Sequence, residues 1–64
     1  MYRVVFDLVN DRFITIVSSR LEAEQTIQRV MIAYHAAGLT AGFDEDHNLI
    51  IRHDGLWVGR IYID

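Results

Sequence analysis

Hydrophobic and polar residues alternate along the first part of the chain, Tyr2–Val9, which reads YRVVFDLV. The alternation has the period of a strand, and β-branched and aromatic residues dominate it. Asn10 and Asp11 tolerate positive φ, so together they suit a short hairpin loop. The next segment, Arg12–Val17, reads RFITIV and is predicted to be the second strand of a hairpin.

A two-residue loop at Asn10-Asp11 determines which side chains of this first hairpin share a face. One face is predicted to hold the cross-strand pairs Leu8–Phe13, Phe6–Thr15 and Val4–Val17. The other face then holds Val5, Asp7, Val9, Arg12, Ile14 and Ile16. A three-residue loop with a bulge would exchange the faces of the second strand. In either register both faces carry several large aliphatic side chains.

The clearest local pattern predicts a helix that begins after Ser19. Ser19 and Glu22 fit a capping box. In this motif the serine oxygen accepts from an exposed amide of the first turn, and the glutamate carboxylate reaches back to the backbone amide of the serine. Apolar residues follow at helical spacing and predict the buried side: Ala23, Ile27, Val30, Met31 and Tyr34. Gly38 is predicted to end the helix in the left-handed conformation, with Leu39 folding back on Tyr34.

The rest of the chain predicts three shorter elements. Leu39–Phe43 is expected to form a short strand, and the polar loop Asp44–Asn48 follows it. The closing segment Leu49–Asp64 consists of two apolar runs around Asp54-Gly55, which is a strong signal for a tight hairpin turn.

This turn predicts a register for the closing hairpin. It pairs His53 with Leu56, Arg52 with Trp57, Ile51 with Val58 and Ile50 with Gly59. One face then gathers Leu49, Ile51, Leu56, Val58 and Tyr62. The other face gathers Ile50, Arg52, Trp57, Ile61 and Ile63. In this register Trp57 lies beside Arg52, and Gly59 leaves room for the indole.

The order of elements is therefore β-β-α-β-β-β, which predicts a small α+β domain spanning residues 1–64. We expect an antiparallel sheet of four or five strands with one helix packed on one face. One helix cannot cover both faces of such a sheet. The second face would expose an apolar patch, and patches of that kind usually mark an interface.

The chain is so short that its hydrophobic core alone is expected to give only limited stability. A domain of about 60 residues buries only about 60% of the surface of its unfolded chain. Its core then contributes roughly 3–5 kcal/mol. The sequence has no cysteine, which excludes disulfides and thiolate metal sites, while 52% of its residues are hydrophobic. Self-association is the supplement that remains, and we expect a homodimer.

The charge of the chain argues against a nucleic-acid partner, and its hydropathy argues against a membrane partner. The net charge is −3, and the six arginines are spread along a chain that contains no lysine. Dispersed cations argue against a general binder of phosphate backbones. No signal-peptide pattern is present, and no apolar run approaches the roughly 18 residues of a membrane span. We expect a cytoplasmic protein without a membrane partner.

Few residues suggest chemistry. Asp44, Asp46 and Asn48 resemble the start of a calcium loop, but Leu49 and Gly55 replace the glycine and glutamate that such a loop needs later. An acidic surface turn explains them better. The spacing of His47 and His53 matches no zinc motif. With no arrangement for nucleophilic catalysis, we expect no enzyme activity, no metal and no cofactor.

These observations predict a small acidic protein-binding module that acts as an inhibitor, an antitoxin-like partner or a phage accessory protein. We expect it to form a homodimer through the uncovered sheet face or an edge strand. Aromatic anchors among aliphatic residues typify binding hot spots, and the predicted interface residues are Ile14, Ile16, Trp57, Ile61 and Tyr62. If the apolar face is used for dimerisation, a target would meet the helix and the acidic loop of Asp44, Glu45 and Asp46.

The alternative is a nucleic-acid-binding protein that uses Arg3, Arg52 and Arg60 on the sheet. We rank it second because the chain is acidic overall. It predicts binding that weakens steeply as the salt concentration rises.

Overall fold

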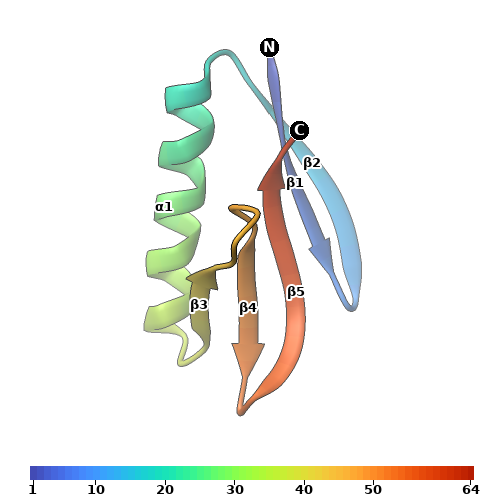
Figure 1. The fold of residues 1–64 in the computed structure, drawn as a ribbon, viewed down its shortest axis with the longest axis vertical. Helices are drawn as coiled ribbons and strands as arrows, with labels where there is room; N and C mark the ends of the chain where they lie inside the picture. Colours follow the sequence, from blue (N-terminus) through green and yellow to red (C-terminus); the bar gives the residue numbers. More distant parts are fainter.

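The computed structural model describes all residues 1–64 and shows a five-stranded antiparallel sheet with one helix on one face (Figure 1). The elements are β1 (Tyr2–Leu8), β2 (Asp11–Val17), α1 (Arg20–Ala36), β3 (Thr40–Phe43), β4 (Leu49–His53) and β5 (Leu56–Ile63). The strand order is β2-β1-β5-β4-β3, so β2 and β3 are the two edges. The predicted α+β class, order of elements and position of the helix are confirmed.

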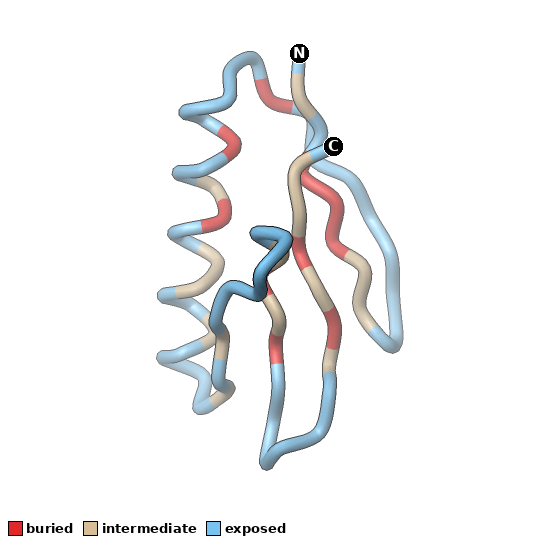
Figure 2. The backbone as a smooth tube through the Cα atoms, in the orientation of Figure 1, coloured by how far each residue is buried: buried red, intermediate tan, exposed pale blue.

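The core lies between α1 and the sheet, where the helix excludes water from one side of the central strands (Figure 2). Its buried members are Val4, Phe6, Val17, Ala23, Ile27, Leu49, Ile51 and Ile61. The apolar side predicted for α1 is confirmed, because its other members pack against this cluster. The helix falls short of the length and apolar character that crossing a membrane requires.

Both ends of α1 are closed by hydrogen bonds. The Ser19 hydroxyl accepts from the Glu22 amide at 3.1 Å. The Glu22 carboxylate, however, accepts from the hydroxyl and amide of Ser18, at 2.6 and 3.3 Å, which corrects the predicted bond to the Ser19 amide. At the other end Gly38 has a φ of 87°, and the Leu39 amide donates to the Tyr34 carbonyl at 3.0 Å, as predicted.

The first hairpin turns one residue earlier than predicted. Its loop is Val9-Asn10, and β2 begins at Asp11, which pairs with Leu8. The predicted pairs are therefore wrong, because each residue of β1 lies opposite a residue two positions earlier in β2 than predicted. The predicted faces are right, because side chains two positions apart on a strand share a face. The new register places Phe6 opposite Phe13, whose rings stack with centroids 4.5 Å apart.

The closing hairpin contains a bulge that the sequence did not signal. The turn at Asp54-Gly55 and the pairing of Arg52 with Trp57 are confirmed. Beyond that pair the register shifts, and Ile51 lies opposite Gly59 instead of Val58. A bulge turns every later residue of its strand to the other face. The faces predicted for Ile61, Tyr62 and Ile63, which follow the bulge in β5, are therefore wrong.

Gly59 allows β1 to approach β5 closely. A Cβ atom on Gly59 would lie 2.6 Å from Leu8 Cδ2 and 2.7 Å from the Asp7 carbonyl oxygen. The room that Gly59 leaves is thus used by Leu8 and the β1 backbone, and not by the indole of Trp57 as predicted. In the register of this contact, Gly59 lies opposite Leu8, and Ile61 lies opposite Phe6 in the core.

Candidate functional site

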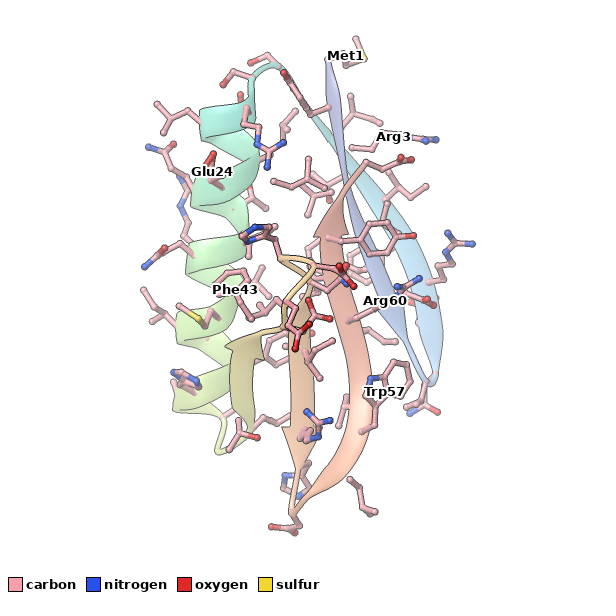
Figure 3. The ribbon with its side chains drawn as sticks, viewed as in Figure 1. Met1, Arg3, Glu24, Phe43, Trp57 and Arg60 are labelled. Carbon is pink, nitrogen blue, oxygen red and sulfur yellow. The ribbon has the colours of Figure 1, made fainter.

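The sheet face that points away from α1 is the candidate functional surface, and we call it the uncovered face (Figure 3). Its members follow from the strand register, because side chains directly opposite each other on neighbouring strands point to the same face. They are Arg3, Val5, Asp7, Arg12, Ile14, Ile16, Thr40, Gly42, Ile50, Arg52, Trp57, Arg60, Tyr62 and Asp64.

A small apolar cluster occupies the half of the uncovered face formed by β1, β2 and the end of β5. Val5 is only 1% exposed although no helix covers it. Its cross-strand neighbours are Ile14 on one side and Tyr62 on the other. Ile14 and Ile16 are themselves 46% and 53% exposed. Val5 is therefore buried by side chains that remain open to solvent.

An ionic row borders this cluster. Asp7 lies opposite both Arg12 and Arg60, and its carboxylate pairs with Arg60 at 3.6 Å between Nε and Oδ2. Arg12, the other cross-strand neighbour of Asp7, makes no ion pair with it. The Arg60 guanidinium also lies 4.7 Å from the centre of the Tyr62 ring, at a distance typical of a cation–π contact. Arg60 thus links the charged row to the apolar cluster.

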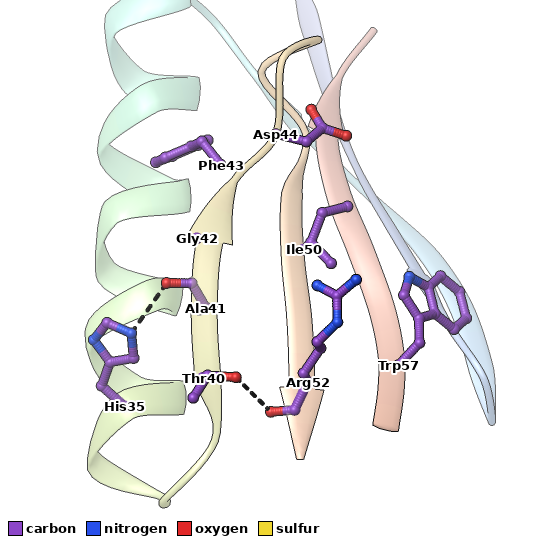
Figure 4. A pocket seen from close by; sticks show the side chains of 9 residues that line it. All are labelled: His35, Thr40, Ala41, Gly42, Phe43, Asp44, Ile50, Arg52 and Trp57. Carbon is purple, nitrogen blue, oxygen red and sulfur yellow. Dashed lines mark hydrogen bonds between the residues drawn. The ribbon is translucent and has the colours of Figure 1, made fainter. Parts of the chain in front are cut away.

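A shallow hollow of about 720 Å³ lies on the other half of the uncovered face and reaches around the β3 edge (Figure 4). On the sheet face it is lined by Thr40, Gly42, Ile50, Arg52 and Trp57. Trp57 is 47% exposed, and Arg52 makes no ion pair. An unpaired guanidinium beside an exposed indole is suited to binding a carboxylate or phosphate next to an apolar group.

Charge is distributed unevenly between this face and the rest of the chain. The uncovered face carries four of the six arginines, Arg3, Arg12, Arg52 and Arg60, and two acidic residues, Asp7 and Asp64. Its net charge is +2, whereas the other residues together carry −5. The sequence predicted Arg3, Arg52 and Arg60 on the sheet, and the structure adds Arg12 and places all four on one face, because residues far apart along the chain meet there.

The acidic loop is held together by one of its own carboxylates. Asp44 accepts hydrogen bonds from the amide of Asp46 at 2.9 Å and from the amide and side chain of Asn48 at 2.9 and 3.1 Å. The bonds from Asn48 lower the pKa of Asp44 below its ordinary value. Asp44 therefore closes the loop, while Glu45 and Asp46 are exposed. A role for this loop in binding stays a prediction.

No metal centre is formed by these residues. Leu49, at the position where a calcium loop has glycine, is fully buried in the core. His47 precedes β4 and His53 ends it, so the two imidazoles lie at opposite ends of one strand. No three side chains of the kinds that bind metal ions come together in the structure.

Four of the five residues predicted for the interface lie on the uncovered face. Ile14, Ile16 and Tyr62 belong to the apolar cluster, and Trp57 lines the hollow. Ile61 is on the opposite side of the sheet and is fully buried under α1, so its predicted position on the surface is corrected. The bulge before it is the physical reason.

Val5 was predicted on this face of the first hairpin but was not among the predicted interface residues. Val4 and Val5 are adjacent apolar residues in a strand, and both are buried, on opposite faces. Consecutive apolar residues are the signal of a strand that is buried on both sides. The Val4-Val5 pair carries this signal, which would have indicated the buried position of Val5 on the uncovered face.

The fold and the surface together define a small α+β domain with one covered and one open sheet face. No protein-family model matches the chain, and neither a curated protein nor a solved structure is significantly similar to it.

Proposed function

We propose that this chain is a small acidic, non-enzymatic protein-binding module that contacts its target with the uncovered face. It acts as a homodimeric inhibitor, of the kind formed by antitoxin-like or phage accessory proteins. The observation that carries the proposal is the exposure of Trp57, Ile14 and Ile16 on a sheet face without a covering layer. Large exposed apolar residues interleaved with arginines are typical of the centre of a protein interface.

The charge of the uncovered face supports a target with an acidic surface. Arg52 and Arg12 make no ion pairs within the chain, so their guanidinium groups are available to carboxylates of another protein. Complementary charge speeds the encounter of two proteins and selects among partners. The apolar residues beside these arginines would supply most of the affinity.

The test compares two exposed apolar residues that lie on different surfaces. Trp57→Ala removes the anchor of the uncovered face, and Ile32→Ala alters the outer side of α1, where Ile32 is 61% exposed. Proteins that bind the tagged wild-type chain are identified, purified and titrated by calorimetry. We expect Trp57→Ala to weaken binding by about tenfold or more, and Ile32→Ala to leave it unchanged. Equal effects of the two variants would show that the target binds elsewhere.

A second candidate function is the binding of single-stranded nucleic acid. It is favoured by one observation, the net positive charge of a face that also exposes Trp57 and presents Tyr62. Single-strand binders combine cations with aromatic rings on which bases stack. Arg3 and Arg60 are paired with Asp64 and Asp7, which leaves fewer free cations than this function needs.

Fluorescence anisotropy with labelled single-stranded DNA and RNA tests this alternative. It predicts binding at low salt that weakens steeply as salt rises, and a clear loss of affinity in Arg52→Gln. If neither oligonucleotide binds at low salt, the alternative is excluded.

A further inference from the structure

The edge of β2 presents a row of outward-facing backbone groups, in which the Arg12 amide donates to the Asp11 carboxylate at 2.8 Å and the groups of Ile14 and Ile16 have no partner. Arg3 and Asp64 exchange both backbone hydrogen bonds between β1 and β5, at 3.2 and 2.8 Å. Backbone groups alternate in direction along a strand, so the residues of β1 on either side of Arg3 bond to β2. In β2 the residues that bond to β1 are therefore Asp11, Phe13, Thr15 and Val17. The amides and carbonyls of Arg12, Ile14 and Ile16 point away from the sheet.

Apart from the charged residues Asp11 and Arg12 at its start, this edge lacks the features that usually prevent strands of different molecules from pairing. Natural edge strands are protected by lysine, proline, bulges or short length. β2 has seven residues and a regular register, and it contains no lysine, proline or glycine. In Figure 1 the helix and β2 lie on opposite sides of the view, so α1 does not cover this edge.

The other edge of the sheet is protected. β3 has only four residues, one of which is Gly42. His35, from the last turn of α1, places its Nε2 atom 3.1 Å from the Ala41 carbonyl oxygen, as Figure 4 shows. A carbonyl that already has a hydrogen-bond partner is a poor template for a new strand. The open backbone groups are thus concentrated on β2.

We propose that β2 pairs antiparallel with β2 of a second copy of this chain, about a twofold axis at Ile14. Ile14 then lies opposite the Ile14 of the other copy, and Arg12 lies opposite its Ile16. The two sheets become continuous, and both uncovered faces lie on the same side. This inference gives the homodimer of the proposed function its contact surface and rests on that function only for the expectation of a homodimer.

The register follows from the three outward-facing residues. Only an axis at Ile14 pairs all three of them with each other. The Ile14 pair then exchanges both of its hydrogen bonds, and each Arg12–Ile16 pair does so when the Arg12 amide leaves the Asp11 carboxylate for the carbonyl of the other copy. An axis at Arg12 would place two arginines directly opposite each other, which is unfavourable. With the axis at Ile14, each arginine meets an isoleucine, and no like charges are opposed.

Charge also favours the edge over the other available dimer, in which two uncovered faces would stack. Stacking would bring two surfaces of net charge +2 into contact and desolvate four arginines on each. Edge pairing leaves those arginines in solvent. It also leaves Trp57 and the hollow free, because they lie on β3, β4 and β5, away from β2.

The experiment introduces the same charge at two positions of one strand. Ile14→Glu places two carboxylates opposite each other across the axis, whereas Ile16→Glu places each carboxylate opposite Arg12 of the other copy. Both residues are about half exposed, and circular dichroism confirms that each variant is folded. Molar mass is then measured by light scattering on a sizing column over a range of micromolar concentrations.

We expect the wild-type chain to elute with twice its chain mass of 7.4 kDa. Ile14→Glu should raise the dimer dissociation constant by about tenfold or more, because like charges directly opposite each other are destabilising. Ile16→Glu should stay within about threefold of wild type. Trp57→Ala should leave the dimer unchanged. If Ile14→Glu does not fold, Ile16→Arg replaces it, since it opposes Arg12 and should dissociate the dimer.

Three results would overturn the proposal. One is a wild-type chain that stays monomeric at all concentrations, and another is equal weakening by Ile14→Glu and Ile16→Glu. The third is dissociation by Trp57→Ala, which would indicate stacked faces. A monomer that still loses target binding in Trp57→Ala would refute the edge-paired dimer while supporting the protein-binding function, so the two failures are distinguishable.

Discussion

The two faces of the sheet bury apolar residues by different means, and Val4 and Val5 show the difference most directly. These neighbours in β1 are 0% and 1% exposed. Val4 belongs to the core cluster beneath α1, together with Ile27 of the helix. Val5 points the other way and is covered only by side chains of the sheet itself, among them Ile14 and Tyr62. Equal burial therefore does not imply an equal environment.

The comparison explains why one face supports the fold and the other is available for binding. On the covered face, helix and sheet exclude water from both sides, and no polar side chain is buried there. On the uncovered face, the residues that shield Val5 are themselves partly exposed and alternate with arginines. A face built in this way gains further burial only when another molecule covers it.

The largest expected effect separates two adjacent isoleucines of β4 that point to opposite faces. Ile51 is fully buried in the core, and Ile50 is half-buried on the uncovered face. Ile51→Ala should cost about 2–5 kcal/mol, because it leaves a cavity between two packed layers. Ile50→Ala should cost about 1 kcal/mol, because solvent and the neighbouring Arg52 side chain can occupy the space.

Urea unfolding followed by circular dichroism measures both values. Since the core of so small a domain supplies only roughly 3–5 kcal/mol, Ile51→Ala should be largely unfolded without denaturant. Similar losses in the two variants would mean that the faces contribute equally to the fold.

A smaller effect is expected at the glycine where β1 and β5 meet. Gly59→Ala introduces a methyl group within 2.7 Å of the Asp7 carbonyl oxygen, and the backbone there cannot move without breaking the pairing of β1 and β5. The expected loss is about 1–3 kcal/mol. Gly42→Ala is the matched control, because no atom lies within 4 Å of the added Cβ.

Thermal unfolding compares the two glycine variants. Gly42→Ala should change the free energy of unfolding by less than about 0.5 kcal/mol or stabilise the chain slightly. A Gly59→Ala variant as stable as wild type would contradict the close approach of β1 to β5.

These contrasts also show how far the sequence predicts the molecule. The β-strand and helix periods were sufficient for the order of elements, because tertiary packing agrees with local preference along most of the chain. The faces of the first hairpin were predicted correctly although its loop was misplaced by one residue. Such a displacement shifts each cross-strand pair by two residues, and a shift of two keeps every side chain on the same face. The strong pattern in α1 likewise predicted its buried side correctly.

In the closing hairpin, the faces of the last residues were predicted wrongly, and the reason is physical. Beyond its bulge, β5 is aligned with β1, where Gly59 lies opposite Leu8, a residue far from it in the sequence. No local pattern encodes such a contact, so Ile61 was expected on the surface and lies in the core. Arg3, Arg52 and Arg60 were predicted on the sheet, but the net charge of +2 on one face depends on the order of the strands and does not follow from a local pattern.

The smallest effect concerns the hydrogen bonds between Ser18, which follows β2, and Glu22, in the first turn of α1. Glu22, in the first turn of α1, has a pKa below its ordinary value of 4.5, mainly because the Ser18 hydroxyl donates to its carboxylate and the Ser18 amide does so as well. A carboxyl whose pKa is lower in the folded chain than in the unfolded chain binds fewer protons when folded. Its contribution to stability is therefore complete above about pH 4.5 and is lost as the pH falls through the lowered value.

Ser18→Ala removes the stronger of the two donors and retains the amide, so the pKa of Glu22 should rise toward its ordinary value. The pKa of Asp44 is lowered by Asn48 in a separate loop and serves as the internal control. Both are measured in one experiment by following the carboxyl carbon shifts in an NMR titration. If the pKa of Glu22 is unchanged in Ser18→Ala while that of Asp44 is low in both proteins, the serine does not hold the start of the helix. The hydrogen bond from the Glu22 amide to the Ser19 hydroxyl would then be the side-chain cap that remains at the start of α1.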